Sequence, residues 1–212
     1  MESPRAPDLA PRKTPRQARS AVTVDAIFEA TVQVLRRDGG RLTTTRVAER
    51  AGVSVGSLYQ YFPHKDAVLF GVLERYLDVL ADALESACDR SRGEGIAVIA
   101  HNLATAYAEV KRERAVENRP LYAAAQDLKL GRITPVADRI DRAVADVLAT
   151  AADAAFDDPR ETASTLMEGM RVIAREAIAR APDCAAPPSL QDELSRFAHR
   201  CLRTSARTTA RP

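Results

Sequence analysis

Apolar residues recur along this chain at intervals of three and four positions, the spacing of one face of an α-helix. Over residues 43–62 the pattern has the clearest boundaries. The apolar positions there are Val47, Ala48 and Ala51 in a first stripe, and Leu58 and Phe62 in a second. Gly52 separates the stripes, and a residue without a Cβ suits the left-handed conformation that ends a helix. The pattern predicts two short helices joined by a tight turn, with Thr43 and Ser54 as their N-caps.

The outer face of the second short helix carries no charged side chain. It presents small and hydrogen-bonding residues instead, namely Val55, Gly56, Ser57, Tyr59, Gln60 and Tyr61. A helix that faces only solvent normally carries Glu and Lys on this side, so the face is predicted to meet a polar partner. This arrangement is typical of the recognition helix of a helix-turn-helix, which enters the major groove of DNA. A plain helical hairpin inside an all-helical domain is the alternative.

The order of residues in this stretch is more specific than its periodicity. The matching positions are Thr43, Val47-Ala48, Ala51-Gly52-Val53-Ser54, Gly56-Ser57-Leu58-Tyr59-Gln60-Tyr61-Phe62 and Lys65. In these residues and spacings the chain resembles the DNA-binding signature of the TetR (tetracycline repressor) family. The resemblance implies a helix-turn-helix domain followed by a helical effector-binding and dimerisation domain. His64 departs from the family pattern, which commonly has Ser or Asn there, and this leaves the capping of the next helix open.

The residues expected to bind DNA belong to the first turn of the first short helix, to the second helix and to the positions just after it. The full set is Thr44, Thr45, Arg46, Ser54, Val55, Gly56, Ser57, Tyr59, Gln60, Tyr61, His64 and Lys65. Hydroxyl, guanidinium and backbone N–H groups can bind phosphates, whereas Ser57 and Gln60 can reach base edges. For Tyr61 and Lys65 the phosphate role is implied by the resemblance.

Positive charge is concentrated around the same stretch. Residues 12–65 carry ten Lys or Arg against four Asp or Glu, a balance of +6, although the whole chain has a net charge of only +2. A module that binds a polyanion requires such a local excess.

The rest of the pattern predicts an all-α protein of about nine helices. The other helices are expected from Val24 to Gly39-Gly40, and then over 66–89, 96–110, 120–131, 135–148, 160–181 and 189–202. Asp158 followed by Pro159 marks the start of the eighth helix as an N-cap and a first helical residue. We expect a disordered basic arm over 1–19, a DNA-binding domain over 20–66, an effector-binding and dimerisation domain over 67–204, and a disordered tail over 205–212.

Two kinds of partner are expected for the C-terminal helices, of which the last two carry long apolar stripes although the preceding helices can already enclose a core. A small hydrophobic effector is expected against Tyr76, Leu103, Tyr107, Tyr122, Met167 and Met170, although each could be an ordinary core residue. A two-fold homodimer is expected through the last two helices, at Leu166, Met170, Ile173, Ala177, Leu190, Leu194, Phe197 and Cys201. Packing within one chain is the alternative for these stripes, and a protein antagonist is the alternative to a small effector.

No pattern of catalytic or metal-binding residues is present. The three histidines lack a partner at metal-binding spacing, and no Gly-rich phosphate loop or G-x-S-x-G turn occurs. The three cysteines form no C-x-x-C pair, which fits a reducing cytoplasm, and no apolar run approaches the ~18 residues of a membrane span. We therefore predict a cytoplasmic, cofactor-free repressor that a small effector releases from a palindromic operator. A helical enzyme with a fortuitous signature is the remaining alternative.

Overall fold

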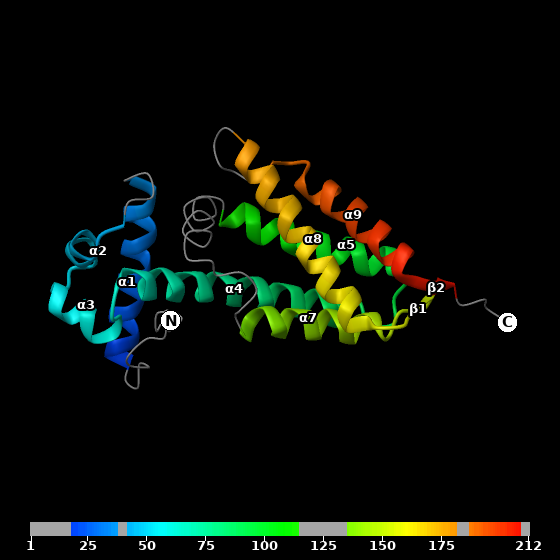
Figure 1. Cartoon of the computed structure of the whole chain (residues 1–212), viewed down its shortest axis with the longest axis horizontal. Coiled ribbons are helices and arrows are strands. Elements are labelled where there is room, and N and C mark those ends of the chain that lie inside the picture. Colours follow the sequence, from blue (N-terminus) through cyan, green and yellow to red (C-terminus); the bar gives the residue numbers. More distant parts are fainter. Residues whose placement is uncertain (1–17, 38–41, 115–134, 182–186, 209–212) are drawn as a thin grey trace, which may run out of the picture. The chain divides into compact units, whose positions relative to one another are not determined.

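The computed structural model describes residues 18–37, 42–114, 135–181 and 187–208, which form eight helices and one two-stranded sheet (Figure 1). These residues divide into two compact units. The first ends at Tyr76, and the second begins at Leu77. The all-α prediction is confirmed, with the small sheet as an addition. Within the described residues, no helix has the length and apolar character needed to cross a membrane.

The N-terminal unit contains α1 (Ala18–Arg37), α2 (Thr44–Ala51), α3 (Val55–Tyr61) and the first part of α4 (Lys65–Arg90). Its core is made by Ile27, Ala30, Val34, Val47, Ala48, Leu58, Phe62, Ala67 and Val68. The rings of Phe28 and Phe62 lie 5.5 Å apart and tilted. A Cβ added at Gly71 of α4 would come within 2.7 Å of the Phe28 ring, so this close approach requires glycine.

The ends of the two short helices agree with the predicted caps. The Thr43 hydroxyl accepts a hydrogen bond from the backbone N–H of Arg46, and Gly52 ends α2 with a φ of 68°. The Ser54 hydroxyl accepts from the backbone N–H of Ser57 at 2.9 Å. Because a cap satisfies backbone groups that the helix leaves open, local chemistry fixes both ends of the turn.

The C-terminal unit contains α5 (Ile96–Glu113), α7 (Pro135–Leu148), α8 (Pro159–Arg180), α9 (Leu190–Ser205) and the second half of α4. α8 packs against both α7 and α9, and α9 also packs along α5 (Figure 1). The ring of Phe197 lies directly over Gly169, where an added Cβ would overlap it. Asp158 caps α8 as predicted, since its carboxylate accepts from the N–H groups of Arg160 and Glu161 at 2.9 Å.

The turn between α4 and α5 is fastened to the segment that follows α7. The carboxylate of Asp153 accepts a hydrogen bond from the backbone N–H of Ile96 at 2.8 Å, which caps α5 from a distant part of the chain. The Thr150 hydroxyl accepts from the N–H of Gly93, and the carbonyl of Glu94 accepts from the N–H of Ala152. The Asp153 bond satisfies an N–H of a helix whose N-cap residue, Gly95, has no side chain to cap it, and the other two bonds hold the turn before it.

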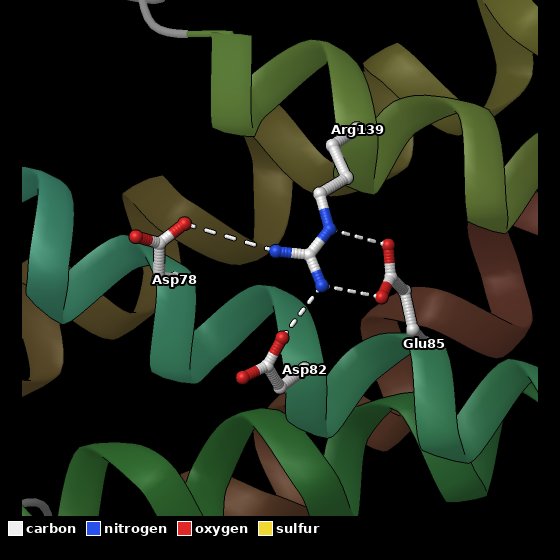
Figure 2. A network of polar contacts seen from close by, with 4 residues as sticks. All are labelled: Asp78, Asp82, Glu85 and Arg139. Carbon is white, nitrogen blue, oxygen red and sulfur yellow. Dashed lines mark hydrogen bonds and ion pairs between the residues drawn. The ribbon is translucent and has the colours of Figure 1, made fainter.

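One arginine of α7 gathers three carboxylates of α4 (Figure 2). The Arg139 guanidinium donates from Nε and Nη2 to both oxygens of Glu85, and from Nη2 to Asp82 at 2.6 Å. Its Nη1 lies 3.7 Å from Asp78. The three acids occupy successive turns of α4, so the bidentate pair with Glu85 and the contact with Asp82 tie α7 to that stretch of helix.

Several expectations need correction. The tail was expected to be disordered from residue 205, but Ala206–Thr208 forms strand β2, which pairs antiparallel with β1 (Ala154–Phe156). α1 begins at Ala18, so the last two residues of the arm expected over 1–19 belong to a helix. The last helix was expected from residue 189 to 202, but α9 runs from Leu190 to Ser205. The hydroxyl of Ser189 donates to Glu193 and makes no capping bond to the backbone. The helix expected over 120–131 lies outside the described residues.

Candidate functional site

The first turn of α2 presents the polar groups that were predicted to meet phosphates. Thr45 and Arg46 are exposed there, and Thr44 is half-buried. The Thr44 hydroxyl lies 3.1 Å from the phenol oxygen of Tyr59, a hydrogen bond that joins α2 to α3. This pair was not foreseen from the sequence, because the two residues belong to different helices. It holds the Tyr59 side chain, which is 41% exposed, against the start of α2.

α3 separates its two faces sharply. Leu58 is fully buried in the core, whereas Ser54, Gly56, Tyr59 and Gln60 are exposed. Val55, Ser57 and Tyr61 are half-buried, and Val55 and Tyr61 pack partly against the core, so only part of each can contact another molecule. The hydroxyls of Ser54 and Ser57 lie 2.8 Å apart, so Ser57 is engaged with the helix cap.

His64 resolves the question of how α4 begins. Its Nδ1 accepts a hydrogen bond from the backbone N–H of Ala67 at 3.1 Å, which is the bond a Ser or Asn cap would accept. The imidazole therefore replaces the usual capping residue, with Nδ1 unprotonated in this geometry. Lys65, the next residue, is exposed in the first turn of α4.

Two further contacts support these helices and were not predicted. The Arg50 side chain of α2 donates from Nε to the Gln33 amide oxygen of α1. Arg75 of α4 pairs with Asp25 of α1. Both contacts are exposed, so each adds little stability by itself. Together they connect α1 to the helices on either side of α3.

The residues predicted for an effector lie in the interior. Tyr76, Leu103, Tyr107, Met167 and Met170 are all buried, and Tyr122 lies outside the described residues. Leu103 and Tyr107 are one turn apart on α5, and Met167 and Met170 are one turn apart on α8. Tyr76 is the last residue of the N-terminal unit, while the other four belong to the C-terminal unit. The structure thus groups four of these residues on two helices that contact each other.

Lys111 of α5 was missed by the sequence interpretation. It is 1% exposed, and its ammonium group lies 5.2 Å from the centre of the Tyr107 ring. Its position one turn after Tyr107 on a buried face was a signal that could have been used, because a lysine on an apolar stripe is unusual.

The eight predicted interface residues divide into two groups. Leu166, Met170, Leu190 and Leu194 are at most 1% exposed in the single chain, so they belong to its own core. Ile173 and Ala177 of α8 and Phe197 and Cys201 of α9 keep part of their surface exposed. The neighbouring Val172 is 36% exposed. The prediction of a dimer through these helices therefore depends on the second group.

Comparison with known proteins gives a family match that lies within the N-terminal unit. Residues 21–72 match the family model described as bacterial regulatory proteins, tetR family. The nucleoid occlusion factor SlmA of Haemophilus ducreyi is 31% identical over 74 residues, which are 34% of this chain and 37% of SlmA. The match therefore spans little more than a third of that relative.

Solved structures extend the likeness of fold to most of the chain. FadR of Thermus thermophilus, a TetR-family transcriptional repressor in complex with lauroyl-CoA, is 21% identical, with a TM-score of 0.57 over 89% of this chain and 98% of its own. SmeT, the repressor of the Stenotrophomonas maltophilia multidrug efflux pump SmeDEF, is 20% identical, with a TM-score of 0.54 over 90% of this chain and 95% of its own. At these identities the likeness is one of fold.

Proposed function

We propose that this chain, whose residues 21–72 match the tetR family model, is a DNA-binding transcriptional regulator that represses transcription from a palindromic operator and leaves it when a small hydrophobic effector binds. In this proposal α3 reads bases in the major groove. The first turn of α2 and Lys65 bind the flanking phosphates, which position the protein without reading sequence.

The exposed, uncharged outer face of α3 is the observation that supports base readout. The Gln60 amide is exposed, and a Gln side chain can pair with the edge of an adenine. A Cβ added at Gly56 would meet only the Ser54 hydroxyl, at 3.8 Å, so packing within the chain does not require glycine there. Glycine in a helix costs up to ~1 kcal/mol relative to alanine. Close approach of DNA to this part of the backbone accounts for its presence.

Salt dependence of DNA binding tests the proposal. Lys65→Ala should weaken binding to every duplex sequence alike and reduce the slope of log K against log salt by about 0.9, because one phosphate contact is lost. Arg203→Ala removes an exposed cation from the last turn of α9 and is the matched control, whose slope should equal that of the wild type. A Lys65→Ala slope equal to the wild-type slope would remove Lys65 from the contact set, and a wild-type protein without affinity for any duplex would refute the function.

Effector control rests on the C-terminal unit. The buried apolar residues of α5 and α8 described above are the proposed lining of the ligand site. The proposal is supported by FadR, a protein of similar fold whose structure is a complex with lauroyl-CoA. An effector can release DNA only if it binds the DNA-incompetent conformation more tightly than the competent one. Operator affinity should therefore fall in the presence of the true effector, and ligands that stabilise the protein without changing operator affinity would argue against control by small molecules.

A further inference from the structure

One side-chain hydrogen bond joins the two helices that are proposed to contact DNA. The Thr44 hydroxyl at the start of α2 and the Tyr59 phenol oxygen on α3 lie 3.1 Å apart, although fifteen positions separate the two residues in the chain. Thr44 is half-buried, whereas Tyr59 is 41% exposed. A molecule outside the chain therefore has better access to the phenol than to the threonine hydroxyl.

The two hydroxyls together hold one more proton than their mutual bond uses. Each hydroxyl carries one proton and can also accept hydrogen bonds. Within the part of the chain that the structure describes, neither hydroxyl makes another hydrogen bond. One proton lies between the two oxygens, so the second one is left for an acceptor outside the described residues.

The chemistry of the two groups decides which proton is left. A phenol is a stronger acid than an aliphatic alcohol, and hence the better hydrogen-bond donor. The arrangement that uses this donor best has Thr44 donating to the Tyr59 oxygen and Tyr59 donating outward. Successive hydrogen bonds in one direction polarise each other, so the bond from Thr44 strengthens Tyr59 as a donor. A phosphate oxygen is a charged acceptor, which binds such a donor more strongly than a neutral acceptor does.

We propose that Tyr59 donates a hydrogen bond to a phosphate of the DNA backbone, and that Thr44 is a positioning residue that acts through Tyr59 and does not contact DNA itself. The inference rests on the proposed DNA binding. It separates Thr44 from its exposed neighbour Thr45, which keeps its proposed role as a direct phosphate contact. Because phosphates carry no base information, the pair adds affinity without changing base preference.

Ethylation interference tests this assignment one phosphate at a time, on a duplex that the full wild-type chain selects from a random-sequence pool. Ethylation of a phosphate weakens binding where the protein contacts that phosphate. A phosphate that interferes with the wild type should cease to interfere in Tyr59→Phe, and the same phosphate should cease to interfere in Thr44→Val. Valine has the shape of threonine without the hydroxyl, and circular dichroism and a urea midpoint check that each variant folds.

Affinities for the same duplex give a second readout. Tyr59→Phe and Thr44→Val should each weaken binding by about three- to tenfold, the effect of one hydrogen bond. The double variant should bind no more weakly than Tyr59→Phe alone, because Thr44 has no effect once the phenol is absent. Thr44→Ser keeps a hydroxyl and should restore both the affinity and the interfering phosphate.

Thr45→Val is the matched control, because Thr45 is exposed at the next position of α2 and the Tyr59 bond goes to Thr44 instead. This variant should remove a different phosphate from the interference pattern. Its loss of affinity should multiply with that of Tyr59→Phe, as expected for two independent contacts.

Three results would overturn the inference. If Thr44→Val and Tyr59→Phe removed different phosphates, Thr44 would be a direct contact. If Thr44→Val weakened interference at most phosphates together, the bond would only hold α2 to α3. If either variant kept the wild-type pattern and affinity, that hydroxyl would have no part in binding. The wild-type pattern is itself a test of DNA binding, so a clear pattern combined with any of these results would leave the proposed regulator in place.

Discussion

At the scale of single residues, the side of α3 that we propose faces DNA is partly organised before any contact is made. The Thr44 hydroxyl holds the Tyr59 phenol, and the Ser54 hydroxyl holds the Ser57 hydroxyl. Side chains that are already held lose less conformational freedom on binding than free ones. Gln60 and the backbone at Gly56 then remain as the exposed groups best placed to respond to base sequence.

Replacing Gly56 by alanine should affect the stability of the protein and its affinity for the operator in opposite directions. Because a Cβ at this position has room, Gly56→Ala should raise the free energy of unfolding by up to ~1 kcal/mol while lowering operator affinity, since the new methyl group stands between α3 and DNA. Urea denaturation and a DNA-binding titration measure the two effects. Gly52→Ala is the contrast: its space is open too, but its φ of 68° should make alanine destabilising. A Gly56→Ala variant with unchanged operator affinity would contradict the close approach.

Lys111 predicts a specific pH dependence of stability. Its pKa is about 7 in the folded chain and 10.5 when exposed. Between these values the unfolded chain binds a proton that the folded chain does not, so this residue makes the folded state more stable as pH rises, by at most ~1.4 kcal/mol per pH unit. The stabilising trend ends above the unfolded pKa.

Chemical denaturation at several pH values from about 7 to about 9 measures this effect, with each slope compared between wild type and Lys111→Met. The variant lacks the titrating group, so the wild type should gain stability relative to it as pH rises. Parallel curves for the two proteins would show that Lys111 does not titrate in this range.

At the scale of elements, the parts that could be predicted are those with local chemical signals. Thr43, Ser54 and Asp158 cap helices through their own side chains, and Gly52 ends one through its backbone conformation. The N-terminal caps are short-range hydrogen bonds, so the sequence contains the necessary information. The outward face of α3 was predicted for the same reason, because its period and its lack of charge are both local.

The parts that were missed depend on distant partners. β2 is a three-residue strand in a polar tail, too short to show an alternating pattern, and its partner β1 lies about fifty residues earlier in the chain. Asp153 caps α5 across a comparable separation. His64 was doubted as a cap because histidine is uncommon there, and only the orientation of its ring shows that Nδ1 reaches Ala67.

The Arg139 cluster makes a prediction at the level of two helices. Arg139→Gln would leave Asp78, Asp82 and Glu85 facing each other at spacings of three and four residues on α4, where like charges repel. We expect a lower urea midpoint than in the wild type at low salt. The difference should shrink at about 1 M salt, where exposed charges are screened within ~3 Å.

Arg142→Gln is the control for this effect, since Arg142 is exposed on the same helix one turn later. It should change the midpoint little at either salt concentration. If Arg139→Gln behaved like Arg142→Gln, the ion pairs in Figure 2 would contribute nothing to the attachment of α7 to α4.

At the scale of the whole molecule, the proposed palindromic operator calls for two copies of the chain, because a two-fold protein matches half-sites one helical turn apart, ~34–36 Å. The proposed surface for this contact is made by apolar residues of α8 and α9 that keep part of their surface exposed. Val172, Ile173 and Ala177 lie on α8, and Phe197 and Cys201 lie on α9. In the proposed dimer, two such helices from each copy would form a four-helix bundle, in which the same patch meets itself.

Ile173→Arg tests the dimer. This substitution places an unpaired charge in the proposed contact, at a cost of several kcal/mol of dimerisation free energy. Phe197 is less suitable for the test, because its ring packs over Gly169 within the chain and its replacement would also disturb the fold. Sedimentation velocity should show monomers with unchanged helical content, and operator affinity should fall because each monomer holds only one half-site. Val98→Arg is the matched control, since Val98 is 42% exposed on α5, outside the proposed contact, and should leave the dimer intact. A dimeric Ile173→Arg protein would place the interface on another face.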